Sequence, residues 1–580
     1  MPQASNHPRT RRMTIVAQDP AITDETGAIL TTEVEIPAER LAPGPCGYRV
    51  HVIDYDSSTR TLYEPAVLDG TGGAPLFVKP SNDEIREDPR FHAQNVYAIV
   101  MRILGRFEFA LGRRVSWDFQ SHQIKVAPHA FADANAFYSE RDEALLFGYF
   151  PGRGGKPVFA CLSHDVVAHE TTHALVDGLR GRFTDPSSPD QAGFHEGFSD
   201  VVALLSVFAL RDVVKAVLDR SLAGGSRRGA APDGLVHEKF LTPEALRQSV
   251  LLGLAKQMGE EMSAVRGQAL RRSVKLQPED IQADPEAFRE PHRRGEILVA
   301  AMLNAFVEVW TTRLESLGRI QKKYFDRERI AEEAAAAADY LLTMSIRALD
   351  YTPPVHLEFG DFLSALLTAD HEIRPDDSKY RYRDSLRRSF ARFSIAPASQ
   401  GGAEEGIWLP SQGDVNYECV HFDSMTRDRD EVFRFIWENR QGLGLFEGAY
   451  TRVETLRPCL RIAPDGFALR ETVIECTQLL ELQASELAKL RIRKPDGMSE
   501  DTPVRLQGGI TLIFDERGGM KLAISNQLAG TPETEERQSR RLQDLWDFGH
   551  FNKGASLNRR FSVQHRLRAM GSPRQIQEEW

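Results

Sequence analysis

Apolar residues recur every three or four positions over residues 89–112, and this period predicts a long amphipathic helix. Residues 48–56 alternate between apolar and polar, and the similar run 59–68 follows after a short serine link. The two runs are therefore predicted to pair as a β-hairpin. The helical period also predicts helices over 197–218, 295–317, 329–348 and 359–368.

Strand patterns are interleaved with these helices. They fall on residues 122–130, 135–150 and 508–526, the last of which is predicted to be a hairpin that turns at Glu516–Gly519. A further helix is predicted around residues 471–490. Because strands and helices both contribute many segments, the predicted fold class is α+β.

The chain has 580 residues, a length that suggests two to four domains. Residues 1–45 are polar and contain prolines, and they are predicted to form a flexible N-terminal arm. The predicted domains that follow are a β-rich unit over 46–185, a helical unit over 186–400 and a C-terminal α+β domain of unknown role over 401–580.

Charge and composition narrow the function classes. Hydrophobic residues make up 41% of the chain and charged residues 27%, which is ordinary for a globular protein. A formal net charge of −11 gives no reason to expect nucleic acid or an anionic membrane surface as a partner. The oligomeric state is left open.

The cysteines and the apolar runs indicate in which cellular compartment the protein is expected. Five cysteines are scattered with no CxxC pair, which favours free thiols over disulfides or a cysteine-rich zinc site. The most apolar stretch, residues 297–310, carries Asn304 and Glu308 and is shorter than a membrane span. No signal-peptide pattern follows the N-terminus, so a cytoplasmic location is expected, with export by a non-classical route left open.

Residues 169–173, "HETTH", are the strongest chemical signal in the chain. Residues four apart share one face of a helix, so His169 and His173 can direct two imidazole nitrogens at one metal ion. Glu170 is then close enough to act on water beside the metal without being a ligand. The alternative without a metal site is an ordinary amphipathic helix that carries two histidines and a surface glutamate.

A catalytic zinc site needs a third protein ligand. The metzincin pattern requires glycine at 176 and histidine at 179, where this chain has Val176 and Leu179. The thermolysin-like solution, a glutamate on the following helix with an aspartate one turn later, is matched by "HEGFSD" at 195–200. Glu196 lies 23 residues after His173, and Asp200 is placed to accept the second N–H of a ligand histidine.

"DVVAHETTHALVDGL" with "HEGFSD" resembles the thermolysin-like, Glu-zincin metallopeptidases, and the resemblance extends over roughly residues 46–400. It implies a two-lobed core, with a β-rich N-lobe and a helical C-lobe, to which the C-terminal α+β domain is added. It also implies Zn²⁺ held by three ligands, with Asp200 supporting one of them. The metal ligands are His169, His173 and Glu196.

Two further segments carry the resemblance. "NAFYS" at 135–139 is similar to the family's edge strand that holds the substrate backbone, which implies substrate contacts at Asn135 and Ala136. "REPHRRGEILVAAMLNAF" at 289–306 is similar to the segment whose histidine stabilises the oxyanion, which implies a catalytic His292. Glu290 is a candidate for orienting this histidine. The alternative interpretation is that His292 stands at a helix N-terminus and has no catalytic role.

The chain also departs from the family pattern. His195 stands where the family usually has asparagine, and either contact with the metal site or capping of its helix would explain it. No tyrosine lies between His173 and Glu196, so the family's second oxyanion donor has no match there, and calcium-binding acidic clusters are not evident. The spacing from Glu196 to His292 implies an insertion around 219–285. His164 is predicted not to be a ligand.

The sequence therefore predicts a zinc-dependent metalloendopeptidase that hydrolyses a peptide or protein substrate, with Glu170 as general base. The alternative is a thermolysin-like protein with little or no turnover that acts as a binding or scaffold module. A third hypothesis is an aminopeptidase or small-substrate hydrolase with the same metal chemistry, although no Gly-x-Met-Glu-Asn-type motif is present.

Overall fold

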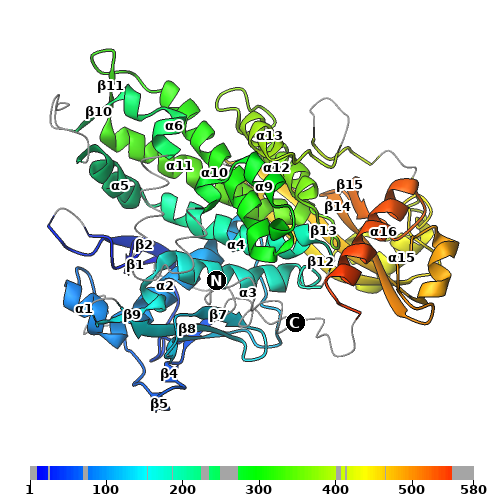
Figure 1. The fold of residues 1–580 in the computed structure, drawn as a ribbon, viewed down its shortest axis with the longest axis horizontal. Helices are drawn as coiled ribbons and strands as arrows, with labels where there is room; N and C mark the ends of the chain where they lie inside the picture. The colour runs from blue at the N-terminus through cyan, green and yellow to red at the C-terminus, as the bar shows by residue number, and fades with distance from the viewer. Residues whose placement is uncertain are drawn as a thin grey trace, which may run out of the picture.

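The computed structural model describes residues 10–23, 26–68, 76–152, 155–185, 187–223, 234–247, 272–399, 406–411, 415–463 and 465–551. Within these residues the protein is a mixed α+β fold with several sheets, as predicted (Figure 1). Most of the insertion expected around 219–285 and part of the polar segment after residue 396 lie outside the described residues.

Residues 10–37 are not part of a loose arm. They form an antiparallel hairpin of β1 (Thr10–Val16) and β2 (Thr31–Pro37). The apolar residues Met13 and Ile15 are buried against the core, and the Val16 N–H donates to Asn95 Oδ1 at 2.9 Å. The prediction was wrong here because polar residues on the outer face of this hairpin hid its buried face.

A five-stranded sheet lies below the helices in Figure 1. Its order is β3-β6-β8-β7, and β9 pairs with β8. The predicted hairpin of 48–56 with 59–68 is reduced to a two-residue pair, because residues 50–52 instead pair in parallel with β6. The five strands of the sheet are β3 (Val50–Val52), β6 (Ile124–Phe131), β7 (Ala136–Ser139), β8 (Ala144–Pro151) and β9 (Pro157–Phe159). The separate two-residue pair consists of β4 (Tyr55–Asp56) and β5 (Thr61–Leu62).

Most predicted helices are present. The segment 197–218 is divided between two helices, because the first ends at Phe208 and the next begins at Arg211. The main helices are α2 (Pro89–Leu111), α3 (His164–Leu179), α4 (Pro189–Phe208), α5 (Arg211–Ala223), α10 (Pro291–Glu315), α11 (Arg327–Ala348), α12 (Phe359–Ile373) and α13 (Tyr382–Arg392).

Shorter elements complete the first 400 residues. They are α1 (Asn82–Glu87), α6 (Pro243–Leu246), α9 (Pro278–Ala283) and the antiparallel pair β10 (Leu235–His237) and β11 (Tyr324–Asp326).

Helix α10 is the one described helix that is long and apolar enough to cross a membrane, with a mean hydropathy of 1.4 over its most apolar window. That window is 72% buried inside the fold. Its apolar surface therefore packs against other helices of the protein, as the surface of a core helix does.

The C-terminal residues form an antiparallel sheet in the order β12-β13-β14-β15 (right in Figure 1). The predicted helix around 471–490 is wrong, because residues 468–483 are a strand followed by a short 3-10 helix. This strand is paired on both sides and is buried continuously from Glu471 to Gln478, so its sequence lacks the alternation that marks half-buried strands. The hairpin predicted over 508–526 is confirmed. The elements are α14 (Phe422–Met425), α15 (Arg429–Glu438), β12 (Tyr450–Ile462), β13 (Ala468–Gln483), β14 (Pro503–Asp515), β15 (Met520–Asn526) and α16 (Pro532–Asp547).

Buried ion pairs join this sheet to the helical core. The guanidinium of Arg461 on β12 contacts the carboxylates of Asp350 and Glu471, and all three side chains are at most 2% exposed. Arg113, just beyond α2, forms a second ion pair with Asp350 at 2.5 Å. The C-terminal sheet is therefore attached to the core through charges that have no access to water.

Candidate metal centre

Helix α3 crosses the interior between β7 and α4 (Figure 1). The N-terminal segment holds its first turn: the His164 N–H donates to the Gln18 carbonyl at 2.8 Å, and the Ser163 hydroxyl donates to Asp19 at 2.5 Å. His169 and His173 lie one turn apart on one face, and both are almost completely buried. A buried helix with two polar side chains on one face needs a polar partner for them.

The partner is Glu196 on α4. The two imidazole Nε2 atoms of His169 and His173 are 2.9 Å apart, and the Glu196 carboxylate oxygens lie 3.6 Å from one and 3.8 Å from the other. One ligand atom from each of the three residues lies within 4.8 Å of the other two. The structure thus brings together all three predicted ligands.

Hydrogen bonds on the outer sides of the rings decide which nitrogens face inward. His169 Nδ1 lies 2.7 Å from Asp200 Oδ1, and this carboxylate requires the proton on Nδ1, which leaves the lone pair on Nε2. Ligand bonds of about 2.0–2.1 Å around a tetrahedral zinc place two nitrogens about 3.3 Å apart. Two nitrogens and one carboxylate near this spacing are a donor set that fits Zn²⁺.

Replacing Asp200 with asparagine is expected to weaken zinc binding by about 10–100-fold, because the second-sphere carboxylate sets the tautomer and basicity of His169. The dissociation constant is measured by competition with a chromophoric chelator. Asp212→Asn, which removes an exposed carboxylate on α5, is the matched control and should bind zinc like the parent chain. If both variants bound zinc with equal affinity, Asp200 would have no role in zinc binding.

Glu170 faces the edge strand β7. Its side chain is fully buried, and Oε2 accepts the backbone N–H of Tyr138 at 3.0 Å. On the same strand, Asn135 Oδ1 accepts the N–H of Ala136 at 2.9 Å, and Ala136 pairs with Phe147 of β8. Of the two predicted substrate-contact residues, Ala136 is the first residue of the strand that contacts Glu170, and Asn135 lies directly before that strand.

His292 reaches the site from the first turn of α10. Its Nε2 lies 3.6 Å from Glu196 Oε2. Helices α4 and α10 cross closely because glycines meet there, and a Cβ at Gly197 would lie only 2.7 Å from the Gly295 carbonyl oxygen. The close crossing brings His292 within reach of Glu196.

Glu290 orients this histidine, as one of the sequence interpretations held. Its Oε1 lies 2.6 Å from His292 Nδ1. Burial raises the pKa of Glu290, but the charge and hydrogen bond of His292 and the Arg293 backbone N–H outweigh it and lower the pKa to about 2. An ionised carboxylate therefore faces the imidazole at neutral pH.

His195 packs on the second ligand, which sequence reasoning left undecided. Its ring stacks on His173 with centroids 4.9 Å apart, and the two Nδ1 atoms are 2.8 Å apart. The sequence feature that could have indicated this contact is the position of His195 directly before Glu196 on the same helix. His164 points elsewhere, with Nε2 3.2 Å from Arg102 Nη1, and it is not part of the group formed by His169, His173 and Glu196.

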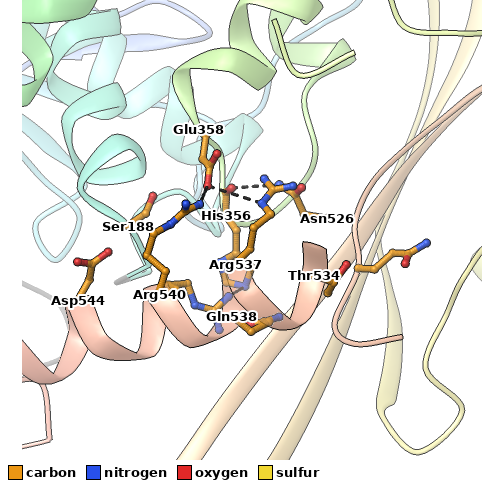
Figure 2. Close-up of a pocket in the computed structure, with 11 residues that line it drawn as sticks. Ser188, His356, Glu358, Asn526, Thr534, Arg537, Gln538, Arg540 and Asp544 are labelled. Atoms are coloured by element: carbon orange, nitrogen blue, oxygen red, sulfur yellow. Dashed lines mark hydrogen bonds and ion pairs between the residues drawn. The ribbon is translucent and has the colours of Figure 1, made fainter. Parts of the chain in front are cut away.

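Figure 2 shows a different, basic cavity between α16 and the segment that carries His356 and Glu358. Arg537 and Arg540 share the Glu358 carboxylate, and Arg541 contacts His356. Burial and the neighbouring Arg537 lower the pKa of Arg541 to about 9, and burial with two arginines lowers the pKa of His356 well below its usual value. A cavity of this charge repels a metal cation, so it is no second version of the metal centre.

Comparison with known proteins adds no relative. No protein-family model matches the chain, and no curated protein matches it. The class of the site therefore depends on its own geometry: a buried centre of two histidines and one glutamate that has a second glutamate and a third histidine beside it.

Proposed function

We propose that this protein is a zinc-dependent endopeptidase of the thermolysin-like, Glu-zincin type. The observation that carries the proposal is the convergence of His169, His173 and Glu196 within 4.8 Å, from two helices, beside a buried Glu170. The arrangement of the fold supports the same type, because α3 runs between a sheet and a layer of helices (Figure 1). The two layers correspond to the proposed β-rich and helical lobes.

Zinc held by these three residues supplies a concentrated positive charge that acidifies water and polarises a carbonyl group. Glu170 removes the proton of the attacking water and then delivers it to the leaving amine. The Tyr138 N–H fixes the carboxylate of Glu170 at 3.0 Å, so the base is positioned before substrate arrives.

His292 stabilises the oxyanion that develops on the substrate carbonyl. The Glu290 carboxylate, 2.6 Å from Nδ1, favours the protonated ring and directs its Nε2–H toward the centre. This arrangement supplies one positively charged donor from the first turn of α10. The His292 donor supplies part of the oxyanion stabilisation that a tyrosine hydroxyl would contribute.

The substrate is an extended peptide that lies along β7. This strand is at the end of the sheet path, and its other side faces α3. Edge strands offer backbone N–H and C=O groups that pair with an added strand. Asn135 and Ala136 lie at the start of this edge, within three residues of the backbone N–H that holds Glu170.

The test is digestion of an unfolded protein such as casein by the full chain, with metal content measured in the same sample. We expect cleavage at internal peptide bonds, loss of activity after dialysis against a zinc chelator, and recovery when zinc is returned. A sample that holds zinc at the centre and cleaves neither casein nor a peptide library would overturn the proposal and leave the binding or scaffold role.

A further inference from the structure

We propose that His92, His129 and Cys161 form a second metal site, which takes Zn²⁺ and is separate from the catalytic centre. The three residues come from α2, from β6 and from the 3-10 turn Ala160–Leu162. All three are buried, and one ligand atom from each lies within 4.8 Å of the other two. This inference does not depend on the proposed peptidase activity.

The hydrogen bonds of His129 fix its tautomer. Its Nδ1 lies 2.7 Å from Asp54 Oδ2, and its backbone N–H donates to Asp54 Oδ1 at 3.1 Å. A carboxylate accepts hydrogen bonds only, so Nδ1 of the neutral ring carries the proton. The lone pair of His129 is therefore on Nε2.

The hydrogen bonds of His92 fix its tautomer as well. Its Nε2 lies 3.0 Å from the Ile85 carbonyl oxygen, which also only accepts, so Nε2 carries the proton. The lone pair of His92 is then on Nδ1, which lies 2.7 Å from His129 Nε2. Two lone pairs at this distance repel each other unless a cation lies between them.

A metal ion suits this position better than a proton. The buried Cys161 thiol adds a soft donor that a bridging proton would not use. A metal ion displaces its proton to solvent and makes it a thiolate ligand.

The charges of the surroundings select a divalent ion. A Cys161 thiolate and the Asp54 carboxylate together neutralise two positive charges, so Zn²⁺ leaves no net charge in this buried pocket. The rings of Tyr63 and Phe159 enclose the histidines, with centroids 5.2 Å from His129 and 4.8 Å from His92 respectively. Nitrogen and thiolate ligands are typical of zinc.

The site would join three elements at the entrance to the catalytic helix, since Cys161 lies three residues before α3 begins. Zinc there would hold α2 and β6 against this turn. Its role is therefore structural, and its loss should lower stability rather than change the bond that is cleaved.

The test uses the metal-free full chain titrated with Co²⁺, whose thiolate complexes absorb strongly in the near ultraviolet. The catalytic centre has no sulfur ligand, so this charge-transfer absorption reports Cys161 alone. We expect two metal equivalents with the band in the parent chain, and one equivalent without it in Cys161→Ser. The matched control is Cys476→Ser, which replaces an equally buried cysteine in the C-terminal sheet. It should keep both metal equivalents and the absorption band.

Two further measurements separate this site from the proposed function. His173→Ala should lose activity and one equivalent yet keep the thiolate band, whereas Cys161→Ser should keep catalytic-site metal. X-ray absorption at the zinc edge of the unmodified chain should show sulfur at about 2.3 Å, which needs no variant to fold. Folded, zinc-loaded protein with no sulfur scatterer, or a band that persists in Cys161→Ser, would overturn the inference and leave a protonated His129 as the bridging group.

Discussion

Glu170→Gln is expected to reduce kcat/KM for peptide hydrolysis by about 10²–10⁴-fold while zinc remains bound. Glutamine keeps the size of the side chain but cannot take a proton from water. Its amide oxygen can still accept the Tyr138 N–H, so the helix and the ligand geometry are retained. Turnover of a fluorogenic peptide and zinc content in the same preparation measure the two properties together.

Asp177→Asn is the matched control for this variant. Asp177 lies on the same helix and is also buried, and burial raises its pKa well above the usual value. It contacts the Tyr138 hydroxyl rather than the metal centre. Its variant should keep activity within a few fold. If Glu170→Gln and Asp177→Asn had similar activity, the general-base assignment would be lost.

Arg461→Met should lower the free energy of unfolding by about 3–5 kcal/mol, because it leaves the carboxylates of Asp350 and Glu471 buried with less compensating charge. The midpoint of urea denaturation is the measurement. The matched control is Arg452→Met on the same strand, whose exposed ion pair with Glu454 should contribute about 0–1 kcal/mol. Equal midpoints for both variants would show that the buried network does not hold the sheet.

The same network predicts a dependence on pH. Burial raises the pKa of Asp350, but Arg113 and Arg461 outweigh it and hold the pKa well below its usual range. The stability that this pair contributes is complete above the unfolded-state pKa of about 3.9 and is lost as the pH falls below it. Denaturation midpoints between pH 7 and pH 3 should therefore fall more steeply for the parent chain than for Asp350→Asn.

The convergence of the three candidate metal ligands could be predicted because their signal is local or nearly so. His169 and His173 lie within one turn of helix, and Glu196 follows on the next helix at a spacing that resembles a known family. The roles of these residues in turnover stay predictions until activity is measured. His195 was harder to interpret, since its contact with His173 depends on how two helices face each other.

Features that depend on distant parts of the chain were missed. His92, His129 and Cys161 are tens of residues apart, and no spacing rule connects a helix, a strand and a turn. The strand β13 was taken for a helix because burial on both faces removes the alternation of polar residues. The hairpin of β1 and β2 was overlooked because its stability comes from α2, which lies 50 residues and more beyond it.

The contacts of residues 18 and 19 with the start of α3 restrict how this protein can be processed. Gln18 and Asp19 accept hydrogen bonds from His164 and Ser163, so the N-terminal hairpin and α3 are anchored to each other. A maturation cut between the hairpin and the sheet would release this anchor from the helix that bears the histidines. Proteolytic removal of this region would therefore leave the first turn of α3 without both hydrogen bonds.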